Sequence, residues 1–197
     1  MSPSNLSMFI ASIFLLSSMS NIIIVTNART TSSSSLIEKA CSDPRLRPNS
    51  KFCVRVLRSH PKIVSATNLF DLSITIMETG ISSATNTRAY IENLLKKSNV
   101  GPNSKGALKE CKSSYDSVIL SFKSALSEVK YDKEYQTATY DLLIGSTDDI
   151  QRCLDNVASG KIKDRNILSG NKVVPIFGLS AYRAKDEHPK GVLPLFW

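Results

Sequence analysis

The stretch from Ser104 to Val129 constrains the fold of this chain more than any other. Apolar residues recur in it at steps of three and four, and lysine, serine and aspartate occupy positions between them. The residues in line are Leu108, Cys111, Tyr115, Val118, Phe122, Ala125 and Val129. This spacing predicts an amphipathic helix with one buried seam. Because an apolar stripe of this kind is stable in water only under partner helices, the sequence predicts further helices that cover it.

Two further long segments show the same spacing. The first runs from about Ala66 to Lys97, and the small residues Gly80 and Ala84 in its apolar line would let a neighbouring helix approach closely. The second runs from about Lys133 to Val157, and Gly145 inside it predicts a bend or a weak spot. With the seam helix, these segments make three of the expected helices.

The last candidate helix is shorter and covers residues 172–184. Asn171 is its predicted cap, and Pro175 falls in its first turn, where the missing N–H costs least. No alternating apolar run stands beside a hairpin turn, so the sequence does not predict strands. The predicted fold is therefore all-α, an up-and-down four-helix bundle with short loops.

A small helical hairpin is expected in front of the bundle. Ser35 and Glu38 have the spacing of a capping box, which predicts a short first helix. Pro44 and Pro48 end it, and a second short helix follows that ends before Pro61. The preceding residues 29–34 are a serine and threonine run without periodicity, which predicts a flexible leader.

The N-terminal residues predict the compartment. Residues 1–28 contain no charged side chain, carry apolar runs, and end with small residues at a plausible cleavage point. This pattern favours a signal peptide and a secreted protein. The alternative, a retained membrane anchor, needs an uninterrupted apolar run of about 20 residues. Polar residues at positions 17, 18, 20 and 21 interrupt this one.

Secretion changes what the four cysteines imply. All of them follow the predicted signal peptide, and an even number in an oxidising compartment favours two disulfides. Three pairings are possible, and the spacing favours the local ones, Cys41 with Cys53 and Cys111 with Cys153. The first would close a short loop in the hairpin, and the second would tie two long helices together.

The sequence carries no recognisable reaction chemistry. It lacks a glycine-rich phosphate loop, a G-x-S-x-G elbow and an H-E-x-x-H motif, so neither an enzyme nor a cofactor is expected. Both histidines, His60 and His188, precede prolines, and no C-x-x-C occurs, so no metal is expected. Asp148 and Asp149 point about 100° apart on a helix, and a solvated face explains them better than acid/base catalysis.

Charge is the remaining general feature. The formal net charge is +8, which attracts polyanions, but the basic residues are scattered and interleaved with serine and acidic residues. The sequence shows no aromatic residues interleaved with basic ones, and its single tryptophan is terminal. Nucleic acid is therefore not expected as a partner. Acidic cell-wall polysaccharide is another polyanion that this charge attracts, and no membrane contact is expected after signal removal.

The arrangement of the cysteines and their flanking residues resembles the plant invertase and pectin methylesterase inhibitors. The segments that carry this resemblance are Cys41–Pro44, Phe52–Val54, Ala107–Cys111, Tyr115–Val118 and Cys153–Asp155. Lys133–Ala138 is similar to the pollen-allergen branch of the family. The resemblance covers residues 35–184, and residues 185–197 form an irregular tail with three helix breakers.

The resemblance implies a four-helix bundle with an N-terminal hairpin and the two local disulfides. It also implies a secreted, apoplastic inhibitor that occludes the substrate cleft of a cell-wall enzyme, either a pectin methylesterase or an acid invertase. Invertase inhibitors present a Pro-Lys-Phe motif ahead of the fourth cysteine. Here the nearest counterpart is Lys133–Tyr135, which favours the methylesterase.

An inhibitor of this kind needs a rigid contact surface instead of a catalytic residue. We expect that surface on exposed polar positions of the second and third long helices. These positions are Lys112, Asp116, Thr147, Asp148, Asp149 and Gln151. The alternative function is a non-inhibitory extracellular helical module that binds pectin or a small apolar ligand.

Overall fold

The computed structural model describes residues 33–97 and 101–185, and this part of the chain is helical without strands. Residues 33–40 are helical and lead into a short 3-10 turn. The elements that follow are η1 (Pro44–Asn49), α2 (Ser50–Arg58), α3 (Pro61–Val64), α4 (Leu69–Leu95), α5 (Pro102–Ser127), the π-turn η2 (Glu128–Asp132), α6 (Tyr135–Ser146), α7 (Asp148–Ser159) and α8 (Arg165–Lys185).

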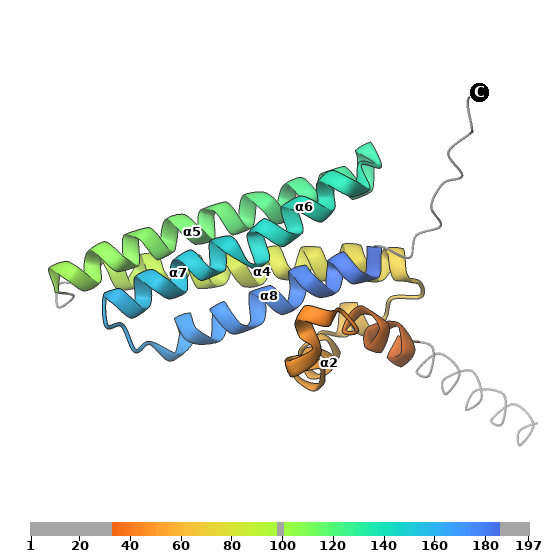
Figure 1. Ribbon diagram of the computed structural model, residues 1–197, viewed down its shortest axis with the longest axis horizontal. Coiled ribbons are helices and arrows are strands. Elements are labelled where there is room, and N and C mark those ends of the chain that lie inside the picture. The colour runs from red at the N-terminus through yellow and green to blue at the C-terminus, as the bar shows by residue number, and fades with distance from the viewer. Residues whose placement is uncertain (1–32, 98–100, 186–197) are drawn as a thin grey trace, which may run out of the picture.

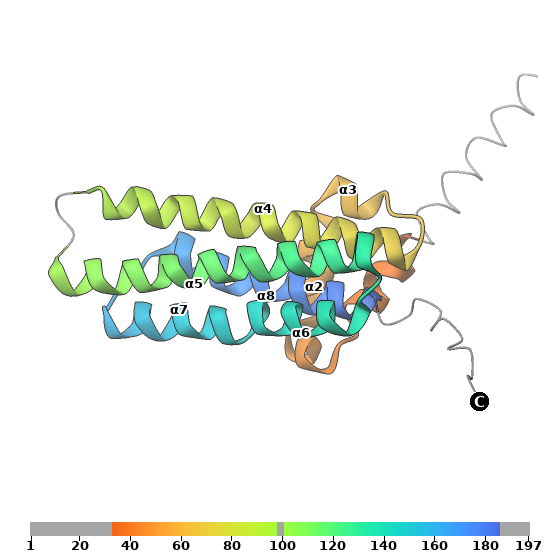
Figure 2. The ribbon, with the colours of Figure 1, turned by 90° about the horizontal axis from the view of Figure 1, so that it is seen from above.

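Four long rods form the bundle (Figures 1 and 2). Helices α4, α5 and α8 are single rods, and α6 with α7 forms the fourth, because the two follow one another along one line. Helix α5 packs against α4 and α7, and α8 packs against α4 and α6. The N-terminal hairpin, residues 33–64 with α2 and α3, lies against one side of the bundle, next to α8 and α4. The predicted fold class is confirmed.

The seam of α5 is buried as the periodicity predicts. Every apolar residue of that line, from Leu108 to Val129, is at most 3% exposed. Ser114, which the pattern leaves outside the seam, is also fully buried, and its hydroxyl donates to the Glu110 carbonyl at 3.1 Å. The helix can bury this hydroxyl because its own backbone supplies the acceptor.

Helix α4 begins at Leu69 with Asn68 as its cap, whose side chain accepts a hydrogen bond from the Asp71 backbone at 2.9 Å. The expected close approach at Gly80 is present. A Cβ placed there would lie 2.5 Å from Cε1 of Phe122 and 3.0 Å from Cβ of Phe177. Glycine therefore makes room for two buried aromatic side chains from α5 and α8.

The third predicted segment breaks at Thr147 and not at Gly145. Thr147 has backbone angles of φ −113° and ψ −70° and separates α6 from α7, whereas Gly145 is helical and buried. A Cβ at Gly145 would lie 3.0 Å from Cβ of Ser121. The glycine thus serves close packing against α5, and the bend falls two residues later.

Helix α8 begins at Arg165, seven residues before the predicted start. Its first turn is capped by Asp164, whose carboxylate accepts from the backbone of Asn166 and Ile167 at 2.9 and 3.1 Å. Pro175 therefore lies inside the helix and not in its first turn. An interior proline costs about 3 kcal/mol, but burial of Ile167, Val174 and other apolar residues of α8 outweighs it.

Both predicted disulfides are present. Cys41 pairs with Cys53 inside the hairpin, and Cys111 of α5 pairs with Cys153 of α7. All four residues are at most 2% exposed. The second bridge ties two rods of the bundle across a sequence separation of 42 residues, against 12 for the first.

The N-terminal boundary differs from the prediction. Ser33 and Ser34, assigned to a flexible leader, are helical, and the buried Ser33 hydroxyl donates to the Val64 carbonyl at 2.5 Å. This bond ties the start of the hairpin to its end. The predicted signal peptide at 1–28, the rest of the leader and the tail from residue 186 lie outside the described residues.

Candidate functional site

A catalytic or metal centre was not predicted, and no acidic, cysteine or histidine cluster able to hold a metal occurs within residues 33–97 and 101–185. His60 packs edge-on against Phe177, with ring centroids 5.4 Å apart. None of the described helices is long and apolar enough to span a membrane. The functional candidates are therefore surfaces and grooves.

Asp148 and Asp149 occupy different environments. Asp148 is exposed, whereas Asp149 is 3% exposed, so its predicted place on the exposed contact surface is wrong. The reason is the helical angle of about 100° between neighbours, which turns Asp149 inward. Burial raises the pKa of Asp149, against the attraction of Arg152 at 3.2 Å, and the nearby Asp148 raises this pKa further.

Lys112 and Asp116 belong to an ion-pair cluster at the edge between α4 and α5. Arg88 of α4 contacts Asp116 at 2.5 Å and Glu92 at 2.7 Å, and Lys112 contacts the other Asp116 oxygen at 3.0 Å. Partial burial acts to raise the pKa of Asp116, but the hydrogen bonds from Arg88 and Lys112 outweigh it and lower this pKa. These charges connect α4 to α5 and are paired within the chain.

Thr147, Asp148 and Gln151 are exposed on the α6–α7 rod and do not join that cluster. The Thr147 hydroxyl lies 2.8 Å from the Leu143 carbonyl and 2.9 Å from Oδ1 of Asp148. The Gln151 amide donates to Oδ1 of Asp155 at 2.8 Å. Two separate surfaces thus replace the single one that was expected, with Asp149 on neither exposed face.

Tyr140 is a large exposed side chain that the expected contact surface did not include. Its side chain is 64% exposed on α6, in the same rod as Thr147, Asp148 and Gln151. The sequence signal for this exposure is a large aromatic residue that lies outside the apolar line of its helical segment. We call Tyr140, Thr147, Asp148 and Gln151 the α6–α7 ridge.

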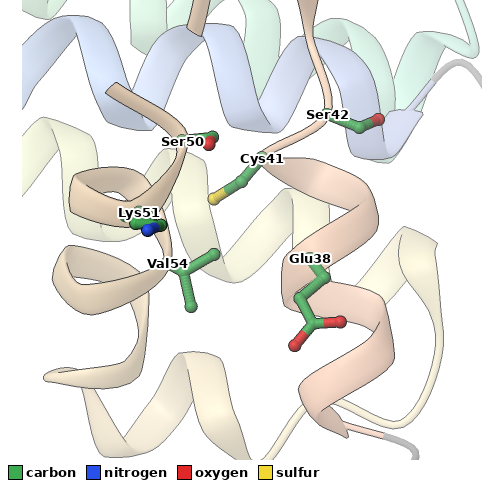
Figure 3. A pocket seen from close by; sticks show the side chains of 6 residues that line it. All are labelled: Glu38, Cys41, Ser42, Ser50, Lys51 and Val54. Atoms are coloured by element: carbon green, nitrogen blue, oxygen red, sulfur yellow. The ribbon is translucent and has the colours of Figure 1, made fainter. Parts of the chain in front are cut away.

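A groove of about 450 Å³ lies in the hairpin next to the Cys41–Cys53 bridge. Figure 3 shows Glu38 on one wall, with Lys51 and Val54 of α2 on the other. The Glu38 carboxylate is ion-paired with Arg58 at 3.1 Å, and so it has a partner already. The groove therefore offers little that would hold a ligand.

Comparison with known proteins gives a consistent result. The model of the family described as "Plant invertase/pectin methylesterase inhibitor" matches residues 35–175. The crystal structure of mutant form A of a pectin methylesterase inhibitor from Arabidopsis is similar with a TM-score of 0.63 and 21% identity, over 71% of this chain and 89% of that chain.

A second crystal structure, of a pectin methylesterase inhibitor from Arabidopsis thaliana, has a TM-score of 0.58 and 21% identity, over 72% of this chain and 90% of that chain. No curated protein matches the chain. At this identity the two structures show a shared fold. The family and both structures are of inhibitors and not of enzymes.

Proposed function

Because the chain belongs to the plant invertase/pectin methylesterase inhibitor family, we propose that it occludes the active-site cleft of a pectin methylesterase in the plant cell wall. Acid invertase is the less favoured target. We also propose secretion to the apoplast after removal of a signal peptide over residues 1–28, and an inhibitor domain over residues 35–184. The absence of the Pro-Lys-Phe motif from the sequence supports the choice of target.

The observation that carries the proposal is that both helices of the α6–α7 ridge are fixed to α5. Helix α7 is covalently tied to α5 through Cys111–Cys153, and Gly145 lets α6 pack closely on the same helix. A surface held in this way loses little conformational entropy when it docks on an enzyme. An inhibitor acts through such preorganisation, because it performs no reaction of its own.

Tyr140 is the proposed anchor of the ridge. Exposed tyrosines are among the residues that contribute most to protein–protein binding, because a large apolar ring is buried without leaving the hydroxyl unpaired. The flanking Thr147, Asp148 and Gln151 supply hydrogen-bonding groups around it. Lys112 and Asp116 form a second, less favoured contact surface, since their charges are already paired.

The test is an inhibition titration of the purified mature chain against a pectin methylesterase and an acid invertase. We expect inhibition of the methylesterase, and replacement of Tyr140 by alanine should weaken it about 10-fold or more. Tyr131→Ala is the matched control, because Tyr131 is 76% exposed but lies off the ridge in η2. Inhibition of the invertase alone would overturn the choice of target. An equal loss of inhibition in Tyr140→Ala and Tyr131→Ala would overturn the assignment of the α6–α7 ridge as the contact surface.

The charge on the ridge gives a second variant. Asp148→Lys should reduce inhibition if the ridge docks, and it leaves the buried Asp149 in place. Lys109→Gln on the exposed face of α5 changes charge elsewhere and should leave inhibition unchanged.

A non-inhibitory module that binds acidic pectin is the second candidate, favoured by the net charge of +8. Retention of the chain on de-esterified pectin, measured in rising salt, tests it. Salt-sensitive retention without inhibition of either enzyme would favour this module over the inhibitor. Weak retention together with inhibition would fit an inhibitor that also contacts pectin.

A further inference from the structure

A crevice of about 610 Å³ lies where α2 of the hairpin meets α7 and α8. Its apolar lining comes from three different helices, with Phe52 on α2, Leu154 on α7 and Leu168 on α8. Leu168 is 44% exposed, although it belongs to a helix whose other large apolar residues are mostly buried. The volume falls within the range of small-molecule sites, which is about 300–1,000 Å³.

The charged lining of the crevice is entirely positive. Arg165 and Lys172 of α8 line it, and no aspartate or glutamate does. Lys172 lies over the Phe52 ring at 5.7 Å, and Arg55 contacts the same ring at 5.5 Å. Neither Arg165 nor Lys172 forms an ion pair within the described part of the chain. The crevice is therefore complementary to an anion.

Asn171 connects the wall of the crevice to α5. It lines the crevice but is only 4% exposed. Its Oδ1 accepts a hydrogen bond from the buried Tyr115 hydroxyl at 2.8 Å, which fixes the orientation of the amide. Its Nδ2 is buried and makes no hydrogen bond within the described residues. The Asn171 side chain is thus directed toward α5, and the positive charge of the crevice comes from Arg165 and Lys172.

We propose that this crevice binds a small carboxylic acid with an apolar or aromatic body. The carboxylate lies beside Lys172 and Arg165, which attract it. The apolar body packs on Leu154, Leu168 and Phe52. Because Phe52 belongs to the hairpin and the other residues belong to the bundle, the ligand also holds the hairpin against α8.

Titration of the nitrogen-labelled full mature chain with phenylbutyrate, followed by NMR, tests the proposal. Phenylbutyramide is the matched neutral probe, since it has the same apolar body without the charge. We expect saturable binding of the acid with a Kd below about 1 mM, and about 5-fold or more weaker binding of the amide. Shifts should be confined to residues around the crevice.

Two exposed substitutions locate the site without threatening the fold. Leu168→Asp places a carboxylate in the crevice and should weaken binding of the acid about 10-fold or more, whereas Leu120→Asp on the exposed face of α5 should not. Lys172→Gln should weaken it about 3-fold or more, with Lys109→Gln as its control. No saturable binding up to about 10 mM, or equal loss in Leu168→Asp and Leu120→Asp, would overturn the site. Equal affinity for acid and amide would overturn the class of ligand.

Discussion

Removal of the bridge between α5 and α7 should lower the free energy of unfolding by about 4 kcal/mol. This value follows from the loop-closure entropy of the 42-residue separation between Cys111 and Cys153 in the denatured chain. The same relation gives about 3 kcal/mol for the 12-residue separation between Cys41 and Cys53. Either loss is large against a typical total of about 5–15 kcal/mol.

Each double alanine variant serves as the control for the other, because the two bridges differ mainly in the length of the loop that they close. All four half-cystines are almost fully buried, so double replacement by alanine removes a similar amount of packing at each bridge. The difference between Cys111→Ala/Cys153→Ala and Cys41→Ala/Cys53→Ala should therefore be about 1 kcal/mol and reflect loop length. Urea unfolding followed by circular dichroism measures both variants, and the slope m reports any change in the denatured state.

The reasoning fails if the hairpin variant is destabilised as much as the bundle variant at equal m. It also fails if loss of the Cys111–Cys153 bridge costs less than about 1 kcal/mol, because the bridge would then constrain little in the denatured chain. A separate early transition in the hairpin variant alone would show that the hairpin unfolds locally.

Three further predictions concern stability. Gly80→Ala should destabilise the protein by about 1–2 kcal/mol, because the new Cβ would meet Phe122 at 2.5 Å. Gly106→Ala in α5 has open space around the new Cβ and should stabilise the protein by up to about 1 kcal/mol. Thermal unfolding midpoints that move in the same direction for both variants would contradict this. Ser146→Ala should stabilise the protein by about 1 kcal/mol, because the buried Ser146 hydroxyl makes no hydrogen bond within the described residues. A urea midpoint lower than that of the parent would count against this prediction. Because the pKa of Asp149 is raised in the folded protein, its contribution to stability is present below the ordinary pKa of 3.8 and is lost as pH rises through the folded-state pKa. Asp149→Asn should therefore gain stability relative to the parent as pH rises from acid to neutral. A gain that does not depend on pH would refute the assignment.

Much of the bundle could be predicted from residue order alone. The line from Leu108 to Val129 repeats every three to four residues, and only a helix with one buried side places all of these residues in the core. The local spacing of the cysteines favoured the pairing that the structure contains. Gly80 was also interpreted correctly, because a small residue inside an apolar line has few other uses.

The start of α8 could not be predicted locally. Asn171 is a suitable cap and Pro175 is best tolerated in a first turn, so both favoured a start at residue 172. In the structure the helix continues back to Arg165, because Ile167 is buried in the bundle and Asp164 caps the first turn. Asn171 was expected to be a cap and is instead a buried side chain bonded to Tyr115 of α5.

The candidate contact surface could likewise be predicted only in part from the sequence. Sequence patterns place Thr147, Asp148 and Gln151 on an exposed helix face, and the structure agrees. The burial of Asp149, the pairing of Asp116 with Arg88 of α4 and the exposure of Tyr140 depend on which rods are neighbours. Periodicity reports which side of one helix is apolar, and so the sequence by itself determined that long helices form and which residues line their buried sides. The angle at which each helix turns toward its neighbours arises from packing of all four rods at once, and only the tertiary structure decided which polar side chains beside the apolar lines are buried or paired with a neighbouring helix.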